Sequence, residues 1–99
     1  MSGLPYLIYV RTCPVCEGGL CRIRVCTAAH HLVGCVVCDE CESVWTDPDM
    51  KQRVVEEHNT YTACCPECGL SLWDEACHWA DIQEVCLLGW YDKVKVART

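Results

Sequence analysis

The stretch that decides the fold is CPVCEGGLCRIRVCTAAHHLVGCVVCDEC, residues 13–41, because a Cys-x-x-Cys pair stands at each end of it. Such a pair delivers two thiolates from one tight turn, and Zn²⁺ prefers four thiolate or imidazole ligands in a tetrahedron. Between the pairs, residues 20–26 alternate in character and residues 32–37 are mostly apolar. Both segments therefore predict β-strands.

A hairpin brings the two pairs together if it turns near residue 27, which is the midpoint of residues 13 and 41. Both pairs then lie at the same end of the two strands. We therefore predict that one metal ion closes this end of the hairpin. Its four ligands are Cys13, Cys16, Cys38 and Cys41.

The order of CPVC, a two-stranded hairpin, CDEC and a third strand through Trp45 resembles the zinc-ribbon family over roughly residues 12–46. The resemblance implies a fold closed by zinc. It implies little about activity, because the family includes transcription factors, ribosomal proteins, enzyme lobes and protein adaptors. Glu17 and Glu42 depart from the family pattern, since many of its turns carry glycine after the second cysteine. This departure predicts strain or a changed shape in both turns.

A third pair, CPEC at residues 65–68, leaves another arrangement open. CDECESVWTDP followed by CPECG is similar to the iron-binding loops of rubredoxin, with one extra residue before the Asp-Pro. That resemblance implies that the second and third pairs share a metal. The first pair would then recruit Cys26 and a histidine, either His30 or His31.

We prefer the hairpin arrangement, in which the third pair needs other partners. The nearest candidates for Cys65 and Cys68 are Cys77 and His78. One zinc ion per chain is therefore expected, and a second is possible. The remaining cysteines lie in or beside apolar stretches, where a free cysteine is usually a small buried hydrophobe. They are Cys21, Cys26, Cys35, Cys64 and Cys86.

Composition also favours a metal over disulfides. The hydrophobic fraction of 52% includes 12 cysteines in 99 residues, which is the composition of a small domain held by cross-links or metals. The N-terminus has no early Lys or Arg, and its apolar run over residues 4–10 is too short for a signal or a membrane span. We therefore expect a cytoplasmic protein with reduced thiols and no membrane contact.

Two helices are predicted after the ribbon. The first covers residues 47–59, with Asp47 as its cap and Pro48 in its first position. The second begins at Asp81, where the spacing to Glu84 fits a capping box, and it ends at Gly89. Its inner face would consist of Ile82, Val85 and Cys86.

These elements predict one α+β domain over residues 1–99, built on a zinc-ribbon hairpin with short antiparallel strands and about two helices. The ribbon covers residues 12–46. Residues 47–99 then supply a helix, the CPEC knuckle, a second helix and an edge strand over residues 91–96. The four tryptophans are expected in the core.

The charge pattern bears on function. The formal net charge is −6, and four thiolates around one Zn²⁺ would add −2. The sequence has neither a Gly-rich phosphate loop nor an HExxH motif, so we expect no enzymatic activity. We predict a non-enzymatic zinc-binding protein whose acidic surface binds a protein with a basic surface. In character, though not in motif, it resembles small acidic bacterial immunity proteins that block a basic toxin such as a nuclease.

Two other functions stay open at this point. A nucleic-acid-binding ribbon, such as a transcription accessory protein, would use Arg11, Arg22 and Arg24 as a basic strip, but only 8 Lys and Arg stand against 14 Asp and Glu. An iron electron carrier would follow from the rubredoxin-like loops. The oligomeric state is not predicted.

Overall fold

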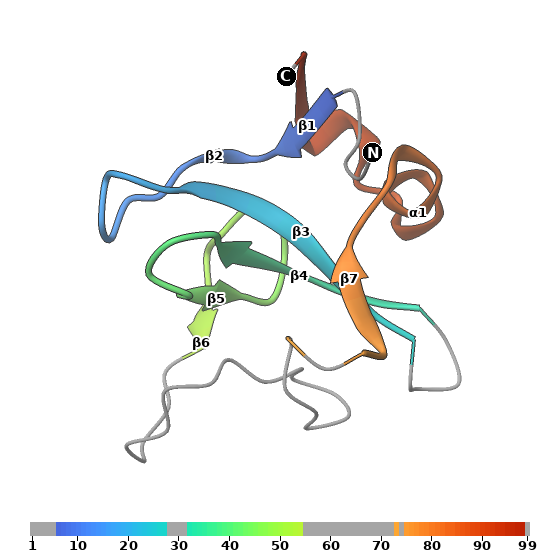
Figure 1. Cartoon of the computed structure of the whole chain (residues 1–99), viewed down its shortest axis with the longest axis horizontal. Coiled ribbons are helices and arrows are strands. Elements are labelled where there is room, and N and C mark those ends of the chain that lie inside the picture. The colour runs from blue at the N-terminus through green and yellow to red at the C-terminus, as the bar shows by residue number, and fades with distance from the viewer. Residues whose placement is uncertain (1–5, 28–31, 55–72, 74, 99) are drawn as a thin grey trace.

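The structure is a computed structural model that describes residues 6–27, 32–54, 73 and 75–98 (Figure 1). Its central element is a hairpin of β3 (Leu20–Cys26) and β4 (Val33–Cys38). The strands are antiparallel, with Cys21 opposite Cys38 and Cys26 opposite Val33. These strands confirm the predicted hairpin.

Short strands extend this hairpin into one larger antiparallel sheet. Strand β4 pairs with β5 (Val44–Trp45), which is the predicted third strand, and β5 pairs with β6 (Arg53–Val54). On its other side, β3 pairs with β2 (Arg11–Thr12) and with β7 (Cys77–Trp79). The long strand β3 therefore pairs with three other strands.

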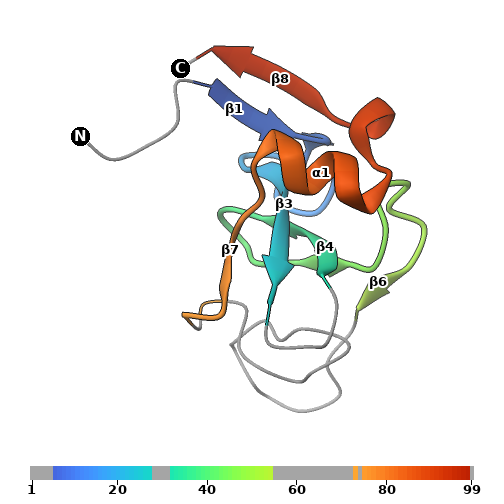
Figure 2. The ribbon, with the colours of Figure 1, turned by 90° about the vertical axis from the view of Figure 1, so that its right-hand side faces the viewer.

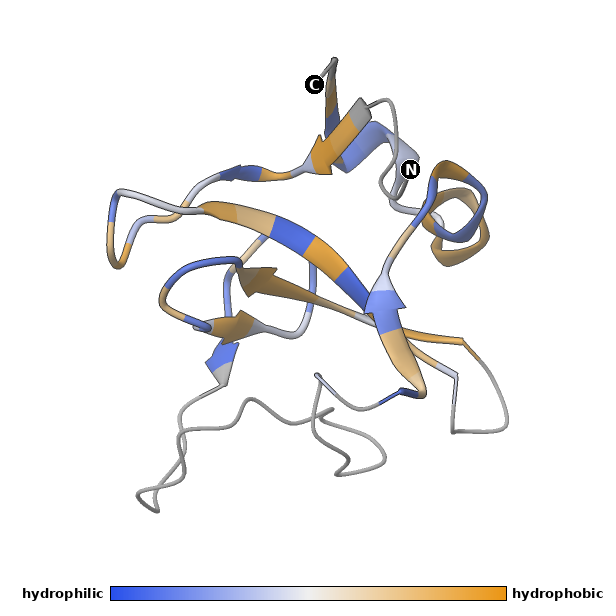
Figure 3. Ribbon diagram, in the orientation of Figure 1, coloured by the Kyte–Doolittle hydropathy of each residue, from blue (hydrophilic) through white to orange (hydrophobic). Residues whose placement is uncertain are grey.

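The two faces of β3 differ in chemistry, because successive side chains of a strand point to opposite sides. Figure 3 shows the alternation as bands of contrasting hydropathy along β3. Cys21, Ile23 and Val25 belong to the main buried cluster, which also contains Val85. Cys26 belongs to a second buried cluster on the other face. That cluster also contains Cys35, Val37, Val44 and Cys77.

A second layer covers the Ile23 face of the sheet. Strand β1 (Tyr6–Tyr9) pairs with β8 (Lys95–Arg98) in a separate two-stranded sheet, and Figures 1 and 2 place this pair and α1 (Ile82–Leu88) on the same side of β3. The 3₁₀ helix η1 (Tyr91–Lys93) connects α1 to β8. The predicted edge strand over residues 91–96 therefore begins later than expected.

The ends of α1 follow the prediction. Asp81 accepts from the Glu84 N–H at 2.8 Å, and the Glu84 side chain accepts from the Asp81 N–H at 3.1 Å, which is a complete capping box. Gly89 ends the helix in the left-handed region, with φ of 77°. The predicted inner face is right for Val85, which is fully buried, and wrong for Cys86, which is exposed.

The helix predicted over residues 47–59 is wrong for its described part, residues 47–54. The Met50 N–H donates to the Asp47 carbonyl at 3.1 Å, and Met50 has φ of 56°, so the chain turns there and continues into β6. Asp followed by Pro begins turns as readily as helices. Within the described residues α1 is the single α-helix, so about two helices are not supported. None of the described helices is long and apolar enough to cross a membrane.

Gly34 sets how closely α1 approaches the sheet. A Cβ atom on Gly34 would lie 2.5 Å from Leu88 Cδ1 and 3.1 Å from Trp90 Cζ3. Real Cβ atoms do not tolerate the shorter distance, so any larger residue must push Leu88 away. Gly34 therefore allows the end of α1 to rest directly on β4.

We expect Gly34→Ala to lower the free energy of unfolding by about 1–3 kcal/mol, the usual cost of overpacking a core. Denaturant unfolding measures this change. The control is the same substitution in a Leu88→Ala background, where the added methyl group has room and should cost less. An equal cost in both backgrounds would contradict the proposed contact.

Candidate metal centre

Two turns of similar shape build the site at one end of the hairpin. The first knuckle, residues 13–17, follows β2, and the second knuckle, residues 38–42, begins at the last residue of β4. Each knuckle is closed by one backbone hydrogen bond. The Glu17 N–H donates to the Cys13 carbonyl at 2.9 Å, and the Glu42 N–H donates to the Cys38 carbonyl at 3.2 Å.

Both knuckles carry a glutamate in the left-handed region, with φ of 57° at Glu17 and 61° at Glu42. This conformation is unfavourable for a residue with a Cβ atom and costs roughly 1–2 kcal/mol. Strain or a changed shape in both turns was predicted from these two positions. Both tight turns form despite this cost, and each places two thiols at the same end of the hairpin.

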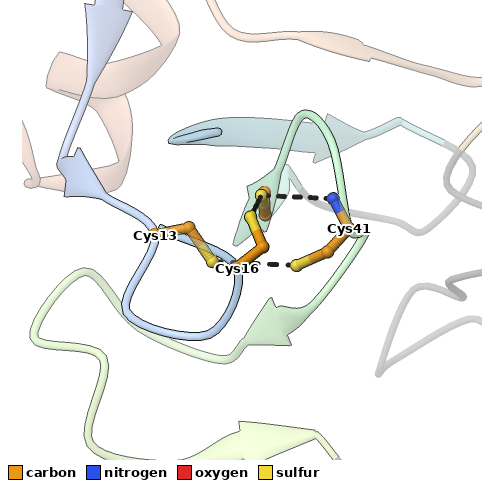
Figure 4. A group of neighbouring side chains, drawn as sticks. Cys13, Cys16 and Cys41 are labelled. Atoms are coloured by element: carbon orange, nitrogen blue, oxygen red, sulfur yellow. Dashed lines mark hydrogen bonds between the residues drawn. The ribbon is translucent and has the colours of Figure 1, made fainter. Parts of the chain in front are cut away.

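The four thiols meet between the knuckles, and Figure 4 labels three of them, Cys13, Cys16 and Cys41. The Sγ atoms of Cys13 and Cys41 are 3.7 Å apart, and those of Cys16 and Cys38 are 3.6 Å apart. All four Sγ atoms lie within 4.8 Å of one another. A tetrahedron with Zn–S bonds of 2.3 Å requires sulfur–sulfur distances of about 3.8 Å. The group therefore fits one tetrahedral metal ion, and it suggests a zinc-ribbon-like site.

Backbone N–H groups surround the buried sulfurs. Val15 N–H lies 3.4 Å from Cys13 Sγ, and the N–H groups of Glu40 and Cys41 lie 3.4 Å from Cys38 Sγ. These donors favour negative charge on sulfur, which is the form that binds a metal.

Burial and these N–H donors shift the pKa values of the thiols in opposite directions. Burial raises the pKa of Cys13, but N–H donors from Cys16 and Val15, together with neighbouring thiols, outweigh it and lower the pKa to about 6. N–H donors from Gly18 and Gly19 lower the pKa of Cys16.

At Cys38, burial dominates and raises the pKa to about 12. Without a cation, the four sulfurs therefore do not all ionise at neutral pH. A bound metal ion would displace the remaining protons.

The site is open on one side. Cys13 and Cys38 are buried, whereas Cys16 and Cys41 are exposed. A shallow hollow at the surface is lined by Cys16, Cys41, Gly18 and Glu40. Cys21, opposite Cys38 on β3, is fully buried, and burial raises its pKa. It is a neutral thiol behind the site, as expected for a small buried hydrophobe.

Gly19 is a site residue that the sequence reasoning missed. A Cβ atom there would lie 2.7 Å from Cys38 Sγ and 2.9 Å from Asp39 Oδ1. The second knuckle thus packs directly on the backbone of Gly19. Gly18 is less confined, since its Cβ would meet Glu40 Oε2 at 3.2 Å, the end of a flexible side chain. A glycine pair after a Cys-x-x-Cys motif is the signal in the sequence.

Two other predicted ligand candidates have different surroundings. Cys77 is buried in β7 opposite Cys26. His78 is exposed, and its Nε2 lies 2.7 Å from Glu84 Oε2. The third pair, Cys65 and Cys68, lies outside the described residues, as do His30, His31 and Cys64.

Two of the three predicted nucleic-acid-binding arginines pack against tryptophan. The Arg22 guanidinium carbon lies 4.3 Å from the Trp79 ring centroid, and that of Arg24 lies 4.6 Å from Trp73 and 4.8 Å from Trp79. Arg24 is buried and Arg11 is exposed. Trp73 is exposed and not a core residue as predicted; its Nε1 donates to Glu42 Oε1 at 2.9 Å.

Comparisons with known proteins give no relative: no protein-family model, curated protein or solved structure matches this chain.

We expect Gly19→Ala to weaken zinc binding at least tenfold, because the new methyl group displaces Cys38 Sγ from the tetrahedron. Competition with a zinc chelator of known affinity measures the change. Gly18→Ala is the matched control and should bind zinc with nearly unchanged affinity, since the Glu40 side chain can move. Equal affinities for both variants would contradict the tight approach at Gly19.

Proposed function

We propose that the four cysteines bind a structural Zn²⁺ and that the protein acts by binding another protein, not as an enzyme. The zinc proposal rests on two sulfur–sulfur distances, 3.6 and 3.7 Å, each between a cysteine of the first knuckle and a cysteine of the second. Four thiolates fill a tetrahedral zinc site and leave no position for water or substrate. Zinc chemistry at this site is therefore structural.

Iron is the competing metal, because tetrahedral sulfur sites suit both zinc and iron. A colour test separates them. Protein purified with both metals present should be colourless under the zinc proposal, whereas iron bound to thiolates absorbs visible light.

A structural zinc can contribute on the order of 10 kcal/mol of apparent binding energy, which is comparable with the stability of a whole domain. Cys16→Ser should therefore abolish stoichiometric zinc binding at this site and lower the melting temperature severely. Native mass spectrometry and thermal unfolding measure the two effects. Cys86→Ser, an exposed cysteine on α1, is the control and should keep its zinc. A Cys16→Ser protein with full zinc and normal melting would refute the site.

The proposed binding surface is the acidic rim of the metal site. Four exposed carboxylates stand on or beside the knuckles: Glu17, Asp39, Glu40 and Glu42. Asp39 Oδ1 accepts from the Leu20 N–H at 2.9 Å, and Glu42 accepts from Trp73, so these two side chains are held in place. A zinc ion with four thiolates adds a net charge of −2 at the centre of this rim. Such a surface attracts a basic protein and accelerates its association.

The structure disfavours the nucleic-acid alternative in one respect. Arg24 is buried and stacked on two tryptophans, so its guanidinium is not presented to a phosphate backbone. The acidic rim would suit an immunity protein, which blocks a basic toxin such as a nuclease by binding it.

The test is a double charge reversal, Glu17→Lys with Glu40→Lys, in protein whose zinc content is unchanged. With a partner isolated by affinity capture, we expect association to slow at least tenfold at low salt and to lose most of its salt dependence. The control reverses Glu75 and Asp92, two other exposed acidic residues, and makes the same change in net charge. Equal effects of the two double variants would show that the rim is not the binding surface.

A further inference from the structure

A side-chain hydroxyl lies against the sulfur of one of the four thiols. Ser43 Oγ is 3.2 Å from Cys41 Sγ. Ser43 is only 8% exposed, whereas Cys41 is exposed and lines the hollow beside the metal centre. The contact therefore joins an accessible thiol to a buried polar group, and a hydrogen bond made at a buried position is stronger than one made in water.

The serine is itself hydrogen-bonded by an arginine from the neighbouring strand. Arg53 Nη2 donates to Ser43 Oγ at 3.3 Å. The pairing of β5 with β6 sets Trp45 opposite Arg53, and Ser43 lies two residues before Trp45. Opposite residues, and residues two apart along a strand, share one face of a sheet. The register thus brings the long Arg53 side chain within reach of Ser43.

The chemistry of the three groups fixes the direction of this chain of hydrogen bonds. A guanidinium has donors only, so Ser43 Oγ accepts from Arg53. A metal-bound cysteine is a thiolate without a hydrogen, so its sulfur can only accept. The single hydrogen of the Ser43 hydroxyl must therefore point at Cys41 Sγ when a metal is bound. Arg53 orients this hydroxyl and, as a cation, strengthens it as a donor.

Cys41 differs from the other three thiols in the kind of donor that it receives. Backbone N–H groups donate to each of the other three sulfurs. In the described part of the chain, the hydrogen bond that Cys41 Sγ makes outside the group of thiols is with a side chain, that of Ser43. The support of this one ligand therefore depends on the identity of Ser43 and Arg53, which lie outside the Cys-x-x-Cys motifs.

We propose that Ser43 and Arg53 are positioning residues of the metal centre, and that the Ser43 hydroxyl, oriented by Arg53, holds the exposed Cys41 thiolate on the zinc ion. This inference rests on the proposed zinc site. The hydrogen bond fixes an accessible ligand, and Arg53 offsets part of the −2 charge of four thiolates around Zn²⁺, so the thiolate leaves the metal less readily. The bond also takes up part of the negative charge of the sulfur, which slows its reaction with electrophiles.

The test measures how fast the zinc-loaded full chain loses its metal to an excess of a colorimetric zinc chelator. We expect Ser43→Ala to lose zinc about tenfold faster, the usual scale for removing a hydrogen-bond partner of a metal ligand. Ser43→Thr keeps a hydroxyl and should stay near the wild-type rate, and Arg53→Ala should lie between wild type and Ser43→Ala. Lys51→Ala removes the same charge from another exposed residue and is the matched control, with no change expected.

A second readout separates this role from a merely structural one. Iodoacetamide, a neutral reagent, modifies the zinc-loaded protein, and peptide mass spectrometry compares Cys41 with Cys16, the other exposed ligand. We expect Ser43→Ala to raise the modification of Cys41 relative to Cys16, whereas a general loosening of the fold would raise both alike. Because Arg53 acts through Ser43, Arg53→Ala should change neither readout further in a Ser43→Ala background.

The outcomes separate this inference from the zinc proposal. Zinc held by the wild type and lost at the same rate by Ser43→Ala and Arg53→Ala would overturn the role of both residues and leave the zinc site intact. A wild-type protein that binds no zinc at the four cysteines would overturn both proposals. Equal effects of Arg53→Ala and Lys51→Ala would show that net charge alone acts, which overturns the hydrogen-bonded chain. If Ser43→Ala does not fold, Arg53→Ala, at an exposed position, decides the outcome.

Discussion

The sulfur tetrahedron constrains the rest of the molecule, because four thiols from two separate turns must lie within 4.8 Å of one another. The protein reaches this geometry by several local means. The register of β3 and β4 sets Cys38 opposite Cys21, Gly19 lets the second knuckle lie against the backbone, and a glutamate in each knuckle adopts a left-handed conformation. The thiols thus converge at one point at the cost of backbone strain in both turns, and the convergence also requires a glycine at position 19.

The hairpin was predictable because two independent signals agree. The alternating pattern of residues 20–26 gives a strand, and a Cys-x-x-Cys pair on each side of the hairpin places both knuckles at one end of it. The register differs from the one that a turn at residue 27 implies, since Cys26 lies opposite Val33 and the hairpin is centred between residues 29 and 30. The helix α1 was predictable because Asp81, Glu84 and Gly89 mark both of its ends. Where several local signals point to the same element, the sequence is a reliable guide.

The wrong predictions arise where one sequence pattern is compatible with two local structures. Asp47 and Pro48 suit a helix start and also a turn, and the left-handed conformation of Met50, which decides between them, leaves no mark in the sequence. Gly19 was missed because spacing cannot reveal how closely a second segment approaches. Trp73 was expected in the core, yet its ring is exposed above Arg24 while its N–H binds Glu42, since an indole can serve as a platform for a cation.

The unequal exposure of the four thiols has a kinetic consequence. Cys16 and Cys41 face the hollow, whereas Cys13 and Cys38 are buried, so in the described part of the chain an oxidant, an alkylating reagent or a competing ligand reaches a bound metal through this hollow. Ligand exchange would therefore proceed in order, with the exposed thiols leaving first and the buried thiols holding the ion until the end. Glu40 lines the same entrance, and its carboxylate disfavours the approach of anionic chelators. An ion held in this way can exchange slowly with anionic competitors and more readily with neutral or cationic ones, whatever its equilibrium affinity.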